Sequence, residues 1–218
     1  MTSSHVMDDN IRVADELIRQ AASQGAEFIL TPEMTTLLDF ESKQVLKKIT
    51  IERDTSWRHF SSLAKELGVW LLIGSIAIKV GNKATNKSFL FSPEGKKIAT
   101  YDKIHMFDVN LPGEDAYKES SVYVAGTEAV VASLPWGKVG LSICYDLRFP
   151  YLYRALSHAG AVMLTVPAAF TEQTGTAHWH ALLRARAIEN GAFVFAPAQC
   201  GKHTNGRRTY GHSLIVDP

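Results

Sequence analysis

Short, uninterrupted apolar runs alternate with helix-like segments along the whole chain, and this alternation constrains the fold more than any other feature. Apolar runs bounded by turn residues predict buried strands at 28–30, 69–73, 139–143, 161–166 and 192–196. Apolar residues at helical spacing predict helices at 10–23, 150–158 and 178–190. Such alternation is typical of layered α/β proteins with mixed sheets. Because no internal repeat or linker interrupts it, we expect residues 1–218 to form one domain.

Composition and charge exclude several classes of protein. The 23 basic and 22 acidic side chains leave a formal charge of +1, so no general attraction to nucleic acid is expected. No apolar run reaches the roughly 18 residues that a membrane helix needs, and the first residues lack the pattern of a signal peptide. The two cysteines, Cys144 and Cys200, lie far apart and form no metal-type pair. A cytoplasmic thiol protein without a disulfide framework is therefore expected.

Three polar residues follow predicted strands or strand ends: Glu33, Lys103 and Cys144. A strand end delivers a side chain to the rim of a sheet, where pockets form. Taken singly, each residue has an ordinary interpretation, as a helix cap or surface charge, a solvated lysine and an inert core thiol. Taken together, they contain the parts of a nucleophilic site.

A thiol needs a base and a positive neighbour before it becomes a good nucleophile. Glu33 can accept the proton of Cys144 if partial burial raises its pKa toward neutrality. Lys103 can stabilise a thiolate and donate to the oxygen that becomes negative in a tetrahedral intermediate. The backbone N–H of Tyr145, at a predicted strand-to-helix turn, is a second donor for that oxygen.

Three sequence stretches resemble the signatures of the carbon–nitrogen hydrolase (nitrilase) superfamily. They are T-P-E-M at 31–34, Y-D-K-I-H-M-F-D at 101–108 and S-I-C-Y-D-L-R-F-P at 142–150. The resemblance implies an amidase that works through a thioester acyl-enzyme. It assigns Glu33 as the base, Lys103 as the acid or oxyanion donor and Cys144 as the nucleophile.

The same resemblance carries further expectations. A second catalytic glutamate near the lysine is implied at Glu119, in K-E-S at 118–120, although a solvated loop charge is the alternative. The implied fold is an α-β-β-α sandwich, assembled as a homodimer or larger through the helices at 150–158 and 178–190. Compared with the family pattern both ends look short, so we expect a domain that lacks its first strand and C-terminal part. No cofactor is implied.

The second half of the chain resembles the Nit branch of this superfamily, in the stretch 167–190. Residues 198–213 resemble the deaminated-glutathione amidases more than the omega-amidases. The implied reaction releases 2-oxoglutarate and cysteinylglycine from a small-molecule amide. An omega-amidase, or another carbon–nitrogen hydrolase acting on a small amide, is the alternative within the enzyme class. A catalytically silent binding protein with this fold is a second alternative, which the complete Glu, Lys and Cys set argues against.

An anionic 2-oxo acid requires cationic donors. Five arginines are available for it: Arg148, Arg184, Arg186, Arg207 and Arg208. Arg148, four residues after the cysteine, either faces the pocket or holds an ion pair that fixes the turn. Arg184 is a candidate, but it diverges from Arg186 on a helix, so at most one of them serves the site. Phe170 either lines the pocket or packs in the core.

His178 and His180 form an H-x-H pair. On a helix the two rings point apart, whereas zinc helices place their ligands four residues apart. No metal site is therefore expected.

Overall fold

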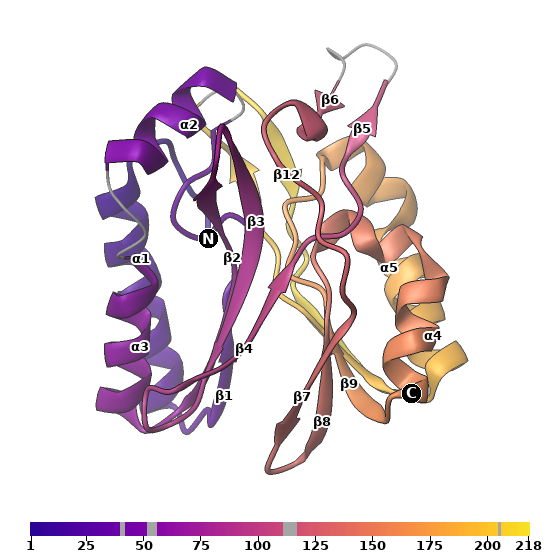
Figure 1. The fold of residues 1–218 in the computed structure, drawn as a ribbon. Coiled ribbons are helices and arrows are strands. Elements are labelled where there is room, and N and C mark those ends of the chain that lie inside the picture. The colour runs from indigo at the N-terminus through magenta and orange to yellow at the C-terminus, as the bar shows by residue number, and fades with distance from the viewer. Residues whose placement is uncertain (40–41, 52–55, 111–116, 205) are drawn as a thin grey trace.

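Two β-sheets face each other in this computed structural model, and helices cover both outer faces (Figure 1). The structure describes residues 1–39, 42–51, 56–110, 117–204 and 206–218. The first sheet has the order β1-β2-β3-β4, from Phe28–Leu30, Trp70–Val80, Lys83–Phe91 and Lys97–Asp102. The second has the order β13-β10-β9-β8-β7, from Leu214–Val216, Phe193–Ala196, Ala161–Thr165, Gly137–Leu141 and Val130–Leu134. The α-β-β-α sandwich expected from the sequence is confirmed.

Helices α1 (Met7–Ser23) and α3 (Ser56–Leu67) pack on the first sheet, and α2 (Ser42–Ile51) contacts β2. On the second sheet lie α4 (Pro150–His158) and α5 (Glu172–Asn190). Two short ladders, β5 (Asp108–Val109) with β6 (Tyr117–Lys118) and β11 (Cys200–Lys202) with β12 (Arg208–Tyr210), belong to neither sheet. Two 3-10 turns complete the described elements, η1 (Glu119–Ser121) and η2 (Cys144–Arg148). No helix in the described ranges has the length and apolarity needed to cross a membrane.

Helix α5 is longer than its sequence pattern predicts. It was expected from residue 178, but it begins at Glu172 because the Thr171 side chain caps it by accepting from the N–H of Thr174. Gly175 permits this start, since a Cβ there would lie 2.3 Å from the Cβ of Tyr210. The helix ends at Gly191, whose left-handed backbone (φ 55°) suits glycine.

Apolar side chains from both sheets form the central core. Leu72 and Leu90 of the first sheet share one buried cluster with Leu141 and Leu164 of the second. A separate cluster joins the first sheet to α1 and α3. Burying these side chains on both faces of each sheet fixes the strands, so that the residues at their ends are rigidly placed.

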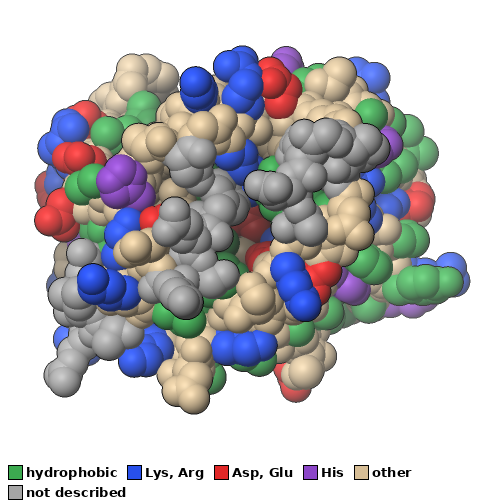
Figure 2. All heavy atoms as spheres, turned by 90° about the horizontal axis from the view of Figure 1, so that it is seen from above, with side chains coloured by type: hydrophobic (Ala, Val, Ile, Leu, Met, Phe, Trp, Pro, Cys, Tyr) green, Lys and Arg blue, Asp and Glu red, His purple; other side chains and the backbone are tan. Residues whose placement is uncertain are grey.

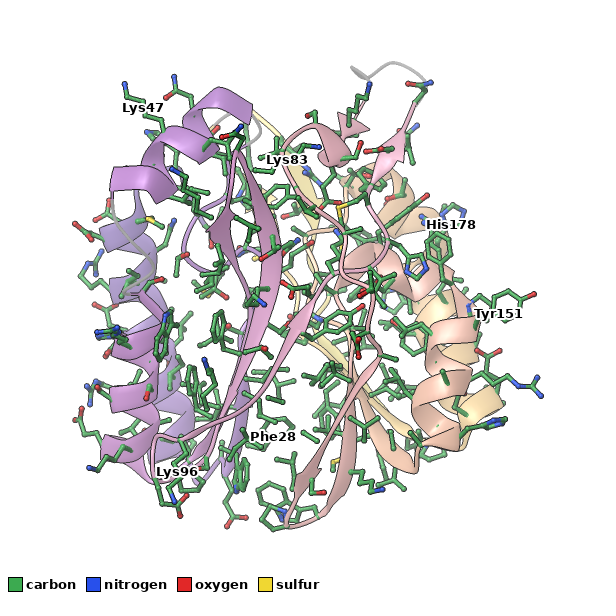
Figure 3. All side chains as sticks on the ribbon, viewed as in Figure 1. Phe28, Lys47, Lys83, Lys96, Tyr151 and His178 are labelled. Carbon is green, nitrogen blue, oxygen red and sulfur yellow. The ribbon has the colours of Figure 1, made fainter. Side chains whose placement is uncertain are left out.

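The sandwich carries a large apolar groove at the edge between β1 and β13. Its volume is about 830 Å³, and its lining includes Phe28, Trp136, Phe193, Leu214 and Ile215. Phe28 stands between the two sheets at this end of the molecule (Figure 3).

Gly74 of β2 lies in close contact with the segments that follow β1 and β9. A Cβ at this position would be 2.1 Å from the Thr31 carbonyl oxygen and 2.6 Å from Pro167. Thr31 leads into Glu33, and the carbonyl of Pro167 accepts the N–H of Cys144 at 2.9 Å. The missing side chain thus lets the segments that carry Glu33 and Cys144 meet.

We expect Gly74→Ala to lower the free energy of unfolding by about 3 kcal/mol or more, because rigid backbone surrounds the new methyl group. Gly81→Ala is the control, because its new methyl group would meet nothing within 4 Å. Only the left-handed backbone at this position (φ 57°) disfavours alanine, and it should lower the free energy of unfolding by about 1–2 kcal/mol. Urea unfolding measures both. Equal destabilisation by the two variants would contradict this packing argument.

Candidate active site

The three polar residues singled out in the sequence meet in one buried place between the sheets. Glu33 follows β1 by three residues, Lys103 directly follows β4, and Cys144 opens η2 just after β8. Their exposed fractions are 4%, 2% and 8%. Buried polar groups cannot hydrogen-bond to water, so they must pair with one another. Their contacts show how they do so.

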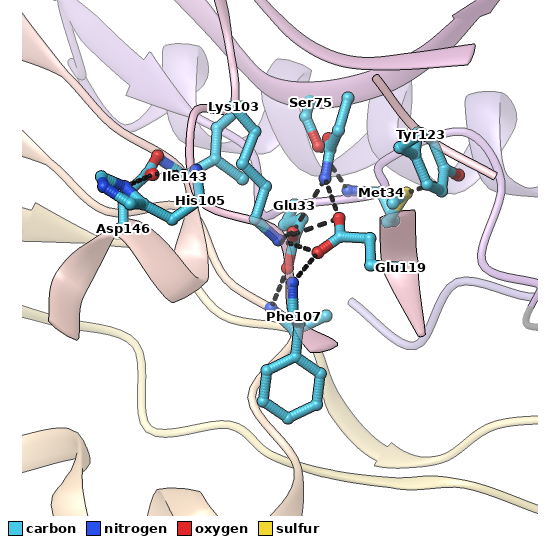
Figure 4. A network of polar contacts seen from close by, with 12 residues as sticks. Glu33, Met34, Ser75, Lys103, His105, Phe107, Glu119, Tyr123, Ile143 and Asp146 are labelled. Carbon is cyan, nitrogen blue, oxygen red and sulfur yellow. Dashed lines mark hydrogen bonds and ion pairs between the residues drawn. The ribbon is translucent and has the colours of Figure 1, made fainter. Parts of the chain in front are cut away.

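Lys103 lies between two carboxylates. Its Nζ donates to Oε1 of Glu33 at 2.9 Å and to both oxygens of Glu119 at 3.0 and 2.9 Å (Figure 4). The backbone N–H of Phe107 also donates to Oε2 of Glu119, at 2.7 Å. The structure thus brings Glu119, which opens η1, into direct contact with Lys103.

Glu33 accepts three further hydrogen bonds at its carboxylate. Asn86 Nδ2 donates to Oε1 at 3.0 Å, and the backbone N–H of Ala169 donates to Oε2 at 2.9 Å. The Cys144 thiol is hydrogen-bonded to the same carboxylate. Asn86 also approaches Glu119 at 3.3 Å and so links the two acids. Sequence reasoning missed Asn86; a polar residue in the middle of a buried strand was the available signal.

Cys144 has a backbone conformation that L-residues rarely adopt, with φ at 49°. Its N–H is held by Pro167, and η2 starts at this residue. A nucleophile on such a strained strand-to-helix turn projects its side chain from the sheet. Tyr145 follows in the first turn of η2, where N–H groups have no acceptor within the helix.

Burial and neighbouring charges set the protonation states. Burial opposes ionisation of Glu33, but the charge of Lys103 and hydrogen bonds from Cys144, Lys103 and Ala169 lower its pKa below the usual value. Burial also opposes the charge of Lys103, yet Glu119 and Glu33 raise its pKa well above the usual value. For Cys144, burial and the charge of Glu33 raise the pKa well above that of a free thiol. The expected upward shift of the Glu33 pKa is therefore wrong, because the adjacent ammonium and the hydrogen bonds together outweigh the effect of burial.

Asp146 anchors the turn that carries Cys144. Its carboxylate is completely buried and accepts the Tyr101 hydroxyl at 2.7 Å and the Ile143 N–H at 2.9 Å. The other oxygen contacts the backbone N–H and ring Nδ1 of His105, at 3.0 and 2.7 Å (Figure 4). The His105 ring stacks on Phe149 at 3.6 Å between centroids. These contacts tie η2 to the first sheet.

Helix α5 holds the other side of the turn through Arg186. Its Nε and Nη2 donate to the carbonyl of Leu147 at 3.1 and 2.9 Å, and Nη1 pairs with Glu189 at 2.7 Å. Arg184, two residues earlier, diverges from it and is exposed on α5. The structure therefore does not support Arg184 as a substrate-binding residue.

A small cavity of about 20 Å³ opens at Cys144. Its lining consists of Phe107, Cys144, Tyr145, Arg148, Ala169, Phe170, Thr171, Thr174 and Arg207. Arg148 Nη2 donates to His178 Nδ1 at 3.1 Å, and its Cζ lies 5.6 Å from the Phe170 ring centre. Arg148 and Phe170 thus both line the pocket, which is one of the two alternatives that the sequence left open for each, whereas Arg207 was only one of five available arginines. The molecular surface is hollowed between the two halves on its upper face, with basic side chains around the hollow (Figure 2).

A buried thiol, a carboxylate and an ammonium on an α-β-β-α sandwich define a cysteine hydrolase site. The Carbon-nitrogen hydrolase family profile matches residues 6–218, and the chain belongs to this family. It is therefore a hydrolase acting on carbon–nitrogen bonds.

Relatives across bacteria and animals carry one name. The chain is 44% identical over 223 residues to a deaminated glutathione amidase of Synechocystis sp., covering 100% of this chain and 82% of the relative. It is 40% identical over 228 residues to the human deaminated glutathione amidase, covering 100% of this chain and 68% of the relative.

Solved structures agree on the fold. The C. elegans NitFhit protein superposes with a TM-score of 0.93 at 36% identity, covering 100% of this chain and 54% of that one. A variant of the Nesterenkonia sp. AN1 amidase has a TM-score of 0.86 at 25% identity, covering 100% of this chain and 82% of that one. In that structure acrylamide has added to the active-site cysteine.

We expect Asp146→Asn to lower the free energy of unfolding by about 1–3 kcal/mol, because an amide nitrogen then faces donors that the carboxylate accepts. Tyr101→Phe, which removes one of those donors, should cost less. Thermal and urea unfolding compare the two variants. If the Asp146→Asn variant were as stable as the unsubstituted protein, the hydrogen bonds of Asp146 would not be what holds the turn at Cys144.

Proposed function

We propose that this chain is a cysteine-dependent amidase that hydrolyses deaminated glutathione to 2-oxoglutarate and cysteinylglycine. The contact of Cys144 with Glu33, beside the ammonium of Lys103, carries the proposal. The name shared by the relatives supports the substrate.

In the first half-reaction the Cys144 sulfur attacks the amide carbonyl as Glu33 accepts the thiol proton. The carbonyl oxygen becomes negative, and Lys103 Nζ and the Tyr145 N–H donate to it. Glu33 then protonates the departing nitrogen, the C–N bond breaks, and cysteinylglycine leaves. The acyl group remains on sulfur as a thioester.

In the second half-reaction Glu33 removes a proton from water, which attacks the thioester carbonyl. The same two donors stabilise the second tetrahedral intermediate. Collapse breaks the C–S bond, the sulfur takes the proton back from Glu33, and 2-oxoglutarate leaves. Glu119 acts as a positioning residue in both halves, because its two oxygens hold Lys103 Nζ.

In this assignment the resting site does not hold a Cys144 thiolate paired with the Lys103 ammonium. The raised pKa of Cys144 and the lowered pKa of Glu33 mean that the thiol keeps its proton until the carbonyl carbon arrives. Proton transfer is then coupled to formation of the C–S bond, and Glu33 is ready as an ionised acceptor.

Two residues of the pocket wall suit the 2-oxo acid end of the substrate. Arg148 can pair with its carboxylate, and Phe170 supplies an apolar wall beside that guanidinium. Arg148 sits in the same short turn as Cys144, so the carboxylate and the reacting carbonyl would be held in fixed relation.

We further propose a homodimer, or a larger assembly, that forms through α4 and α5. Tyr151 on α4 is 84% exposed and Ile188 on α5 is 72% exposed, although both are large apolar side chains. Tyr151 points away from the molecule (Figure 3). The unbridged thiols of Cys144 and Cys200 fit a reducing compartment, and we place the protein in the cytoplasm.

We expect Cys144→Ala to abolish release of 2-oxoglutarate from deaminated glutathione, while Cys200→Ala, at an exposed thiol, keeps it. A coupled assay for 2-oxoglutarate measures both, and it also serves for 2-oxoglutaramate, which gives the same product with loss of ammonia.

Faster turnover of 2-oxoglutaramate would make the chain an omega-amidase instead. A folded protein that hydrolyses neither amide would refute the proposed substrate and favour another carbon–nitrogen hydrolase activity. Retained turnover in Cys144→Ala would refute the mechanism.

The pH dependence of kcat/KM should be flat between about pH 5 and pH 9. Glu33 must be ionised, and its lowered pKa moves the acid limb below the ordinary value of about 4.3. Lys103 must be protonated, and its raised pKa moves the alkaline limb above about 10.4. Initial rates at low substrate concentration give the profile. A rise in kcat/KM through pH 6 to 9, tracking thiol ionisation, would contradict this charge assignment.

A further inference from the structure

Arg207 places a second guanidinium at the cavity beside the nucleophile. It lies just before β12, and its Nη2 donates to the carbonyl of Ala169 at 2.8 Å. Ala169 in turn donates its N–H to Oε2 of Glu33, so one residue separates Arg207 from the proposed base. Its Cζ lies 5.1 Å from the centre of the Tyr117 ring.

Keeping a cation in this position is costly. Burial lowers the pKa of Arg207, while Tyr117, Cys144, Glu33 and Glu119 act in the opposite direction. An arginine still remains charged, because its ordinary pKa is above about 12. The hydrolysis steps do not use this charge, since Lys103 and the Tyr145 N–H already serve the oxyanion. A partly desolvated guanidinium on a cavity wall is suited to bind a carboxylate through paired hydrogen bonds.

The cavity is therefore lined by two cationic side chains, Arg148 and Arg207. Arg148 shares the turn of Cys144, which keeps the acyl half until the end of the reaction. Arg207 is bonded to the residue that contacts Glu33, and Glu33 delivers the proton to the departing nitrogen. Arg207 is thus linked to the proton donor of the leaving nitrogen, whereas Arg148 is linked to the turn that carries the acyl group.

We infer that Arg207 binds the carboxylate of the leaving half of the substrate, and so selects amides whose released amine is itself an acid. This inference rests on the proposed function, in which that amine is cysteinylglycine. Arg148 holds the carboxylate of the acyl half. An amide that releases only ammonia lacks the carboxylate that Arg207 binds.

The leaving half needs more space than the cavity at Cys144 provides. The cavity of about 20 Å³ holds little more than a water molecule. Phe107, Tyr117 and Tyr145 are only half-buried. The rings of Tyr117 and Tyr145 both pack against that of Phe107, each with its centre 5.1 Å from the Phe107 ring centre. The inference requires these aromatic side chains to rotate about χ1 and so make room next to Arg207.

The test compares two substrates that share the acyl half. With Arg207→Gln we expect KM for deaminated glutathione to rise about 10- to 100-fold, the loss typical of a charged hydrogen bond. KM and kcat for 2-oxoglutaramate should change less than about threefold, as for a group that does not touch this substrate. Arg207→Lys keeps the charge and should recover part of the loss.

Arg208→Gln is the matched control. Arg208 is the next residue, is exposed and pairs with Glu172 at 2.7 Å, so its replacement should leave both substrates unaffected. Product inhibition adds a binding measurement that does not depend on turnover rates. Cysteinylglycine should inhibit the unsubstituted protein, and Arg207→Lys should weaken that inhibition several-fold.

Equal losses on both substrates in Arg207→Gln and Arg207→Lys would overturn the inference, because a structural or general electrostatic role predicts that result. Unchanged kinetics on deaminated glutathione would overturn it as well. Failure of the proposed function looks different: the unsubstituted, folded protein would then hydrolyse neither amide.

Discussion

The contact of Lys103 with two carboxylates is the interaction on which the site depends. One ammonium pairs with both Glu33 and Glu119 in a place where water is nearly absent, and Asn86 donates to both acids. Such a buried cluster adds little net stability, but removing one charged member leaves its partners unpaired at a cost of about 3–5 kcal/mol. The chemical consequence is larger than the structural one. Lys103 lowers the pKa of Glu33, and Glu33 raises that of Cys144, so the resting site holds a carboxylate beside a protonated thiol.

The two packed sheets form a rigid frame around this cluster of charged residues. Glu33 and Lys103 come from the ends of first-sheet strands and Cys144 from the end of a second-sheet strand, so the site forms only when the sheets are packed together. Gly74 allows that close approach. The strained turn at Cys144 is then held from opposite sides, by Asp146 toward the first sheet and by Arg186 from α5. Two anchors keep in place a backbone conformation that the chain would otherwise leave.

Much of this was predictable from the sequence, because strand ends and signature stretches are local patterns. The three strand-end residues and the bounds of α4 at 150–158 follow directly from such patterns. Glu119 was accessible only through family resemblance, since a charge in a loop has no distinctive local pattern. Asn86 and Asp146 were missed because their roles depend on partners 53 and 45 residues away. The early start of α5 was missed because Thr174, Gly175 and Thr176 have low helix propensity. The Thr171 cap and the fit of Gly175 against Tyr210 favour the helix there.

The ultraviolet absorbance of the Cys144 thiolate, followed against pH in a Cys200→Ser background, tests the central claim most directly. The account places a protonated thiol beside an ionised Glu33, and therefore predicts no Cys144 thiolate signal between about pH 5 and pH 9. Cys144→Ser in the same background supplies the baseline. A thiolate that is already formed near neutral pH would contradict the account, because Cys144 would then rest as an ion pair with Lys103 and Glu33 would not be its base.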